Sequence, residues 1–339
     1  MATRKTTSMI FTLVFLAFLT VLPKPGKASV SEDLEPFIVS FMPDFYKFWE
    51  KAKDETLEQK ISLWNKLFES KYEEFYQEVI YRGTGQDPTK LKASRLKDFL
   101  GTLTDEDVQR MKGKEPIVQE LISPAVEDMQ KILPEEKGTI SHYIIPSLNT
   151  TSGSARPFQG DMVVYYGLEV LSRFKKPEDI KAVIVHESFH VFHFRRLFPY
   201  YRKKYGENIS LMAALQGEGL LFFSFMEGLT VYAIEKLYPD VFRPGLVEKN
   251  VPLYEENFIP YTREFLKDLE NFNYSTYQKY FIDGTKDPVI PEKFGYWLGY
   301  RITKSLAEKY SIQEMMNWMP DKGVEVMRKE IDEILKQGH

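Results

Sequence analysis

The chain has 339 residues, of which 43% are hydrophobic and 28% are charged, with 45 basic and 49 acidic residues. This length and composition are typical of a globular protein with one large domain or two small ones. The small excess of acidic residues argues against binding to nucleic acid or to an anionic membrane surface.

The first 28 residues have the pattern of a secretory signal peptide. Arg4 and Lys5 precede the apolar run Met9–Leu22, and small residues lead to Ala28, after which we predict cleavage. The run is short for a membrane span, which needs about 20 residues, and an uncleaved N-terminal anchor is the alternative. Cleavage leaves residues 29–339 with 41 basic and 49 acidic side chains, a net charge of about −8. We therefore expect an exported protein, periplasmic or extracellular, with no membrane span after cleavage.

No cysteine occurs in the chain. An exported protein without cysteine has no disulfide framework. The thiolates that dominate structural zinc sites are missing as well, so any zinc would have to be held by histidine and carboxylate side chains. That ligand set favours a catalytic site.

Residues 29–136 are predicted to form an N-terminal helical subdomain. A helix is expected over Ser31–Lys51, and a capping box at Thr56–Gln59 predicts the start of the next one. A second capping signature at Thr104–Asp107 opens a helix that ends before Pro134. The apolar residues at helical spacing are predicted to be the core of this subdomain rather than a ligand-binding surface.

The composition changes near Thr139, and we predict a second domain over residues 137–339. Residues 139–146 and 161–166 are rich in β-branched and aromatic side chains and are predicted to be strands. Residues 147–160, rich in Ser, Thr, Gly and Pro, are predicted to be the loop between them. Such a unit can pair with an extended peptide through main-chain hydrogen bonds, or it can be a small structural sheet.

The motif H-E-S-F-H at residues 186–190 lies inside an apolar helical run, Ile180–Leu197, that is expected to be buried. Residues four apart in a helix face the same side, so His186 and His190 can offer two imidazole nitrogens to one metal ion. Glu187 lies about 100° round the helix, where a general base acting on water beside the metal is needed. The alternative is a buried helix whose histidines bond to backbone carbonyls.

A catalytic zinc needs a third protein ligand, and Glu227 is the first candidate. It lies in an apolar helical region, Leu211–Tyr238, where a carboxylate needs a partner such as a metal, an Arg or a Lys. Glu218 is the second candidate. Its flanking residues, Gly217 and Gly219, predict a loop there.

The rest of the chain is predicted to be helical. The expected helices cover residues 258–272, 274–282, 291–310 and 324–335, with a capping box at Ser311–Glu314. Gly299 lies inside one of them, where glycine costs about 1 kcal/mol relative to alanine. We therefore expect this helix to pack closely against another element at Gly299.

H-E-S-F-H, followed 37 positions after its last histidine by E-G-L-T-V-Y, resembles the gluzincin zinc metallopeptidases. The resemblance implies Zn²⁺ bound by His186, His190 and Glu227. Tyr296-x-x-Gly299 is similar to the Y-x-x-G helix of aminopeptidase N-type enzymes, which implies that Tyr296 donates a hydrogen bond to the tetrahedral intermediate. Weaker similarity extends to predicted zinc-dependent protease domains of bacteria. The strong part of the resemblance covers about residues 140–320.

The resemblance has limits. The G-x-M-E-N segment with which aminopeptidases hold the free amine of the substrate is missing, because the nearest stretch, residues 160–162, lacks the glutamate. The metzincin pattern fails too, with His193 in place of glycine and Arg196 in place of a third histidine. His193 either lines the cleft or is a satisfied helix histidine, the reading we favour.

These observations predict a mainly α (α+β) fold. Its gluzincin-like catalytic domain should contain a small mixed or antiparallel sheet, the metal helix and a C-terminal helical bundle. The predicted function is that of an exported zinc peptidase that cleaves a peptide or protein substrate with Glu187 as general base. Tyr300, His142 and His193 compete with Tyr296 for the oxyanion.

Two other functional classes remain open. One is a catalytically inactive, peptidase-like envelope protein that binds a metal or a peptide, although an intact Glu187 argues against a retired site. The other is a purely structural helical envelope protein with fortuitous histidines.

Overall fold

In the computed structural model of the protein, the described residues are 34–81, 87–206, 218–241, 243–269, 274–282 and 290–337. The predicted signal peptide lies outside these ranges. Within them, no helix combines the length and the apolar character that crossing a membrane requires.

A four-stranded mixed sheet has the strand order β1-β2-β4-β3. Strands β1 (Leu34–Ser40), β2 (Gly138–Ile145) and β4 (Asp161–Gly167) are parallel, and β3 (Ser154–Phe158) pairs antiparallel with β4. Helices make up most of the remaining described chain. The predicted mainly α (α+β) fold with a small mixed sheet is therefore confirmed.

The prediction of a helix from Ser31 was wrong, because residues 34–40 form β1 and the helix begins only at Met42. Strand β1 pairs in register from Leu34 with Gly138 to Ser40 with Ile144. The strand conformation thus depends on a partner about a hundred residues away, which local periodicity cannot reveal.

The predicted loop over residues 147–160 was also wrong in part, since Ser154–Phe158 forms the edge strand β3. The main-chain N–H of Ala155 points away from β4, and Pro157, two residues further, has the same orientation. Because that edge is unpaired in the sheet, the missing N–H of proline breaks no ladder hydrogen bond.

The N-terminal helices pack against the sheet and, through α5, against α7 (Pro177–Tyr205). Capping boxes at Thr56 and Thr104 start α2 and α5, as predicted. Phe75 contacts Tyr143, Phe158 and Tyr165 on the sheet. The elements of this part are α1 (Met42–Ala52), α2 (Leu57–Leu63), η2 (Trp64–Phe68), η3 (Glu69–Lys71), α3 (Glu73–Phe75), η4 (Tyr76–Tyr81), α4 (Pro88–Thr102) and α5 (Asp105–Ile132). Since β1 joins these helices to the sheet, the predicted boundary at residue 136 stays a prediction.

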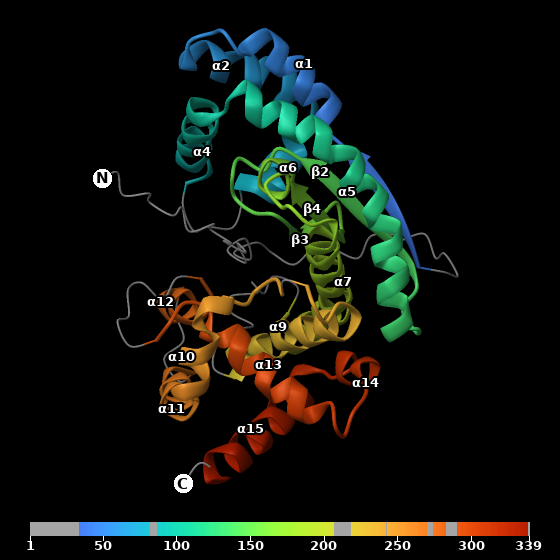
Figure 1. The fold of residues 1–339 in the computed structure, drawn as a ribbon, viewed down its shortest axis with the longest axis vertical. Coiled ribbons are helices and arrows are strands. Elements are labelled where there is room, and N and C mark those ends of the chain that lie inside the picture. Colours follow the sequence, from blue (N-terminus) through green and yellow to red (C-terminus); the bar gives the residue numbers. More distant parts are fainter. Residues whose placement is uncertain are drawn as a thin grey trace.

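Helix α7 (Pro177–Tyr205) carries the H-E-S-F-H motif and packs against β3, β4 and α5. Pro177 lies in its first turn, and every residue from 182 to 194 is buried. The helix continues through Pro199 to Tyr205, beyond the end of the predicted run Ile180–Leu197. Figure 1 shows α7 running from the sheet to the C-terminal helices, so the motif lies between the two halves of the molecule.

The C-terminal half is helical, as predicted. Its elements are α9 (Glu218–Leu237), η5 (Glu248–Asn250), α10 (Val251–Glu256), α11 (Phe258–Asp268), α12 (Tyr274–Tyr277), η7 (Gln278–Ile282), α13 (Phe294–Leu306), α14 (Ile312–Met316) and α15 (Pro320–Gln337), and the short α6 (Leu168–Leu171) follows the sheet. The side chain of Ser311 accepts a hydrogen bond from the N–H of Glu314 at 3.1 Å, as the predicted N-cap of α14 requires.

Helices α9 and α13 cross with their backbones in contact (Figure 1). A β-carbon on Gly299 would lie 1.8 Å from the carbonyl oxygen of Ser224, and one on Gly228 would lie 2.0 Å from the carbonyl carbon of Gly299. The close packing expected at Gly299 is thus confirmed. The crossing brings Glu227, next to Gly228, to the helix that carries Tyr296.

We expect Gly299→Ala to destabilise the protein by about 3 kcal/mol, because the added methyl group forces two buried helix backbones apart. Gly113→Ala is the matched control in another helix, since a β-carbon there meets no atom within 4 Å. It should raise stability by about 0.5–1 kcal/mol. Urea unfolding monitored by circular dichroism measures both changes. Equal effects would show that the contact between α9 and α13 is not tight in solution.

Candidate metal centre

Three side chains from α7 and α9 meet at one point inside the protein. The Nε2 atoms of His186 and His190 are 3.2 Å apart, and the Oε2 atom of Glu227 lies 3.4 Å from the first and 3.2 Å from the second. All three residues are fully buried. Among the described residues, this is the group of His and acidic side chains that could hold a metal ion.

The two Nε2 atoms of His186 and His190 and the Oε2 atom of Glu227 form a triangle, and the size of this triangle fits a zinc ion. Ligand atoms bound about 2.0–2.1 Å from a tetrahedral zinc are about 3.3–3.4 Å apart. Neither oxygen of the Glu227 carboxylate receives a well-aligned hydrogen bond from a described residue. A buried carboxylate without such donors is costly, and a cation held by all three side chains would remove that cost. The two imidazoles and one carboxylate are also the donor types of catalytic zinc sites.

The charges at the triangle are coupled. Burial lowers the pKa of His186 to about 4, which keeps its imidazole neutral and able to bind a metal. Although burial opposes both shifts, the ion pair between His190 and Glu227 raises the pKa of the histidine and lowers that of the glutamate to about 2. Without a metal, the Glu227 carboxylate therefore favours the protonated form of the His190 imidazole.

Glu187 lies beside the triangle without belonging to it. Its side chain turns to the edge of the sheet, where the N–H of Ala155 donates to Oε2 at 3.1 Å. Burial raises the pKa of Glu187 to about 7, with Glu227 adding to the shift and the charges of His190 and Arg156 opposing it. A carboxyl group with a pKa near neutrality can both accept and donate a proton.

Gly153 makes the approach of Glu187 to the sheet possible. A β-carbon at Gly153 would lie 2.8 Å from Cγ of Glu187 and 2.9 Å from Cγ1 of Val183. No sequence pattern indicates this role, because a glycine among Ser and Thr is also typical of a loop. Only the contact between β3 and α7 identifies it.

Tyr296 is on the site side of α13. It is completely buried, and its pKa is raised well above the ordinary value by burial and by the charges of Glu227 and Glu187. A β-carbon on Gly245 would lie 2.5 Å from Cδ1 of Tyr296, so the backbone there packs directly on the tyrosine ring. Tyr296 thus remains protonated and lies within reach of the charges of the triangle.

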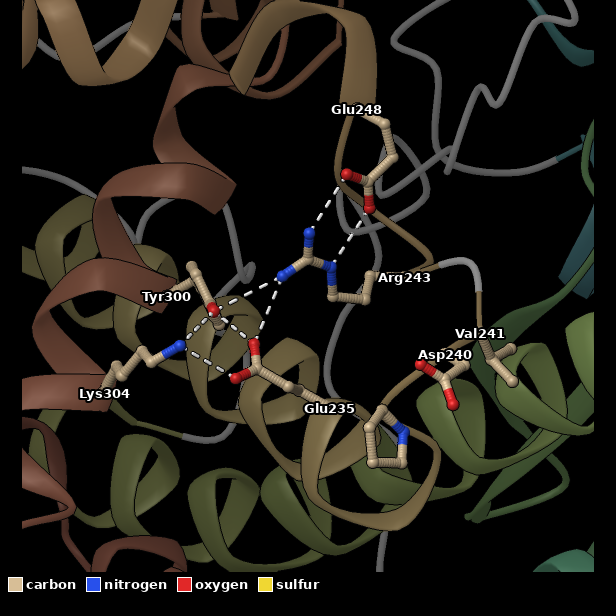
Figure 2. A pocket seen from close by; sticks show the side chains of 8 residues that line it. Glu235, Asp240, Val241, Arg243, Glu248, Tyr300 and Lys304 are labelled. Atoms are coloured by element: carbon tan, nitrogen blue, oxygen red, sulfur yellow. Dashed lines mark hydrogen bonds and ion pairs between the residues drawn. The ribbon is translucent and has the colours of Figure 1, made fainter. Parts of the chain in front are cut away.

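Tyr300 belongs to a different place. It lines a surface pocket of about 510 Å³, shown in Figure 2. Its hydroxyl donates to Glu235 and accepts from Lys304 at 3.0 Å. Arg243 joins this network by donating to Glu235 at 3.2 Å and to Tyr300 at 3.3 Å, and it makes two further hydrogen bonds of 3.0 Å to Glu248. None of the pocket-lining residues is part of the triangle. Tyr300 therefore belongs to a network of ion pairs at the surface and not to the metal centre.

The other two candidates for the oxyanion role are His142 and His193. Nδ1 of His142 is 2.9 Å from the hydroxyl of Tyr166 in the sheet, which gives the histidine a structural partner. His193 follows His190 by one turn, its ring 5.7 Å from that of His190, and burial lowers its pKa well below the ordinary value. Glu218, the second candidate ligand, is the first residue of α9 rather than part of a loop, and its side chain lies outside the described part.

Lys293 is a residue that sequence reasoning missed. It directly precedes α13 and is buried with 4% exposure, and the charges of Glu227, Glu292 and Glu187 act on its ammonium group. No motif or spacing marks a lysine at this position. Its place follows only from the packing of α13 against α9.

Comparison with known proteins shows a match between this chain and one protein family. The family described as "Predicted Zn-dependent protease (DUF2268)" matches residues 118–324. No curated protein and no solved structure matches the chain. The matched stretch covers more than half of the chain and contains His186, His190 and Glu227. The chain therefore belongs to the family of predicted zinc-dependent proteases.

Proposed function

We propose that this protein is an exported zinc peptidase of the gluzincin type, with His186, His190 and Glu227 as its metal ligands. The observation that carries the proposal is the buried triangle of two imidazole nitrogens and one carboxylate oxygen, 3.2–3.4 Å apart, with Glu187 beside it. Export rests on the signal-like N-terminus alone. The missing G-x-M-E-N segment leaves no basis for proposing aminopeptidase specificity.

A zinc ion held by these three side chains would lower the pKa of a water molecule toward 7 and polarise the scissile carbonyl. The role of the protein is to hold the ligands before the metal arrives. The motif on α7 fixes His186 and His190 one turn apart, and the glycine crossing of α9 and α13 fixes Glu227 opposite them. Little rearrangement is then needed on metal binding.

Glu187 is the proposed general base. Its carboxylate takes a proton from the attacking water and later gives it to the leaving amine. The N–H of Ala155 holds one oxygen, Oε2, toward β3. The proton is therefore exchanged through a carboxylate whose orientation is fixed by the strand and whose pKa is brought near 7 by burial.

Tyr296 is the proposed hydrogen-bond donor to the oxyanion. Burial keeps its hydroxyl protonated, so it can donate at neutral pH. A donor that is fixed in place before reaction stabilises the developing negative charge without reorganisation. Packing against the backbone at Gly245 restricts the ring.

The outer edge of β3 is the proposed path for an extended peptide. In an edge strand, alternate residues direct their main-chain groups away from the sheet. Ala155 does so, as its hydrogen bond to Glu187 requires, and so does Pro157. Their carbonyl oxygens can accept hydrogen bonds from a peptide lying next to Glu187.

We expect the purified protein to contain about one zinc per chain after dialysis. His186→Ala, His190→Ala and Glu227→Gln should each reduce this content to near zero, because each removes one of three buried ligands. His193→Ala is the control on the same helix and should retain zinc. Metal analysis of the four variants measures the result, and loss of zinc only in His193→Ala would overturn the ligand assignment.

Glu187→Gln should keep zinc and lower kcat/KM for peptide hydrolysis by about 100- to 10,000-fold, because the amide cannot accept the proton. The fall in kcat/KM is measured by the cleavage of a quenched fluorescent peptide library with and without a chelator. Full activity in Glu187→Gln would exclude Glu187 as the base. Zinc binding without any turnover by the unaltered protein would favour the inactive binding protein instead.

Tyr296→Phe should lower kcat by about 100- to 1,000-fold with little change in KM, because the lost hydrogen bond acts mainly in the transition state. Tyr300→Phe removes the hydroxyl of the tyrosine one turn further along α13, at the surface pocket, and should leave kcat nearly unchanged. Steady-state kinetics on one peptide compares them. Equal losses in the two variants would mean that the tyrosines matter only for packing.

A further inference from the structure

The loop that joins β2 to β3, residues 146–153, is held by a buried carboxylate. Glu169 belongs to the short helix α6 and is 2% exposed. Its Oε1 accepts hydrogen bonds from the hydroxyl of Ser147 and from the N–H of Asn149, both at 2.7 Å. Its Oε2 accepts the N–H of Ser147 at 3.1 Å. One side chain thus fixes the start of the loop from inside the protein.

The conformation of the loop needs such an anchor. Leu148 and Asn149 have φ angles of 61° and 58°, in the left-handed region that is unfavourable for residues with a side chain. Two such residues in a row persist only where the surrounding structure holds them. Glu169 accepts the N–H groups on both sides of Leu148 and so holds this conformation.

The loop also lies directly on the backbone at Gly167, the last residue of β4. A β-carbon at Gly167 would lie 2.1 Å from the carbonyl oxygen of Thr151 and 2.2 Å from Oγ of Ser147. Glu169 follows Gly167 by two positions, so one short stretch of chain supports the loop with its backbone and with its side chain. The position of the loop is therefore set by the end of β4 and the start of α6.

The far end of the loop contacts the proposed base. Oγ1 of Thr151 accepts the N–H of Gly153 at 3.1 Å, and the same hydroxyl donates to the carbonyl oxygen of Gly153. Gly153 packs on Glu187, whose Cγ would lie 2.8 Å from an added β-carbon. Two residues further, the N–H of Ala155 donates to Oε2 of Glu187 at 3.1 Å. A chain of direct contacts thus runs from Glu169 through the loop to the carboxylate of Glu187.

We propose that Glu169 is a positioning residue that orients the carboxylate of Glu187 through this loop. By holding the loop, it keeps the N–H of Ala155 where it donates to that carboxylate. The role rests on the proposed peptidase function, in which Glu187 is the base. It assigns a task to a residue outside the H-E-S-F-H motif, on another element of the fold. Glu169 binds neither metal nor substrate, so its loss should affect the chemical step and leave the zinc content unchanged.

Glu169→Gln should lower kcat for peptide hydrolysis by about 10- to 100-fold, because a displaced loop no longer fixes Glu187. The amide replaces one acceptor oxygen with an NH₂ group that faces the donors of the loop. The loss should lie mainly in kcat, since Glu187 acts in the chemical step. Ser147→Ala removes only the hydroxyl donor and should give a smaller loss of the same kind. Steady-state kinetics and metal analysis of both variants measure these effects.

Glu69→Gln is the matched control. Glu69 is also 2% exposed, and its carboxylate accepts hydrogen bonds from three side chains of the N-terminal helices, those of Trp64, Tyr81 and Lys92. The substitution therefore removes a carboxylate of equal burial whose donors lie outside the loop. It should leave kcat nearly unchanged. An equal fall in kcat in Glu69→Gln and Glu169→Gln would overturn the positioning role, because a general loss of stability would explain both.

A double-mutant cycle separates an effect that passes through Glu187 from an independent one. In the Glu187→Gln background, Glu169→Gln should cause little further loss of the residual hydrolysis, because the side chain that it orients no longer acts as a base. Losses that multiply in the double variant would show that Glu169 acts independently of Glu187, which contradicts the proposal.

Amide hydrogen exchange gives a result that does not require catalysis. Glu169→Gln should speed exchange over residues 151–155, which include the N–H of Ala155, by about 10-fold or more, whereas Glu69→Gln should not. Unchanged exchange in Glu169→Gln overturns the anchoring of the loop. Unchanged kcat overturns the positioning role and leaves the peptidase function intact. If the unaltered protein cleaves no peptide, the peptidase function itself fails, and exchange still decides whether Glu169 anchors the loop.

Discussion

A carboxylate buried between two helices needs a compensating charge, and much of this structure depends on how that need is met for Glu227. The side chain is completely buried on the apolar helix α9, and its oxygen lies 3.2 and 3.4 Å from the two imidazoles of α7. In the absence of a metal, the contact between His190 and Glu227 offsets part of the cost of burying the carboxylate and raises the pKa of the histidine. A zinc ion of the size that fits the triangle would balance the charge more completely, which links the stability of this region to metal binding.

The helices can meet this need only because two glycines let them touch. Gly228 and Gly299 allow the backbones of α9 and α13 to come together, so that Glu227 and Tyr296 reach the same place. A third glycine, Gly153, lets Glu187 lie against β3. The chemistry proposed here thus depends on three positions without side chains, each next to a residue of the site in space.

The electrostatic design separates the roles of the acidic groups. Glu227 has its pKa lowered by a histidine, whereas Glu187 has its pKa raised by burial. The first therefore stays charged as a ligand and the second can exchange a proton.

The sequence by itself determined the local parts of the protein. The helix repeat places His186, Glu187 and His190 near one another, and the capping boxes depend on hydrogen bonds within one turn. Glu227 could be chosen as the candidate third ligand because a carboxylate in an apolar helix is costly without a partner. Tertiary structure decided what depends on distant partners. Strand β1 pairs with a strand about a hundred residues away, β3 is a strand because β4 lies beside it, and Gly153 acquires its role from the helix that packs on it. Local propensity carries no information about such contacts, since their energy comes from groups that are close only after the chain has folded.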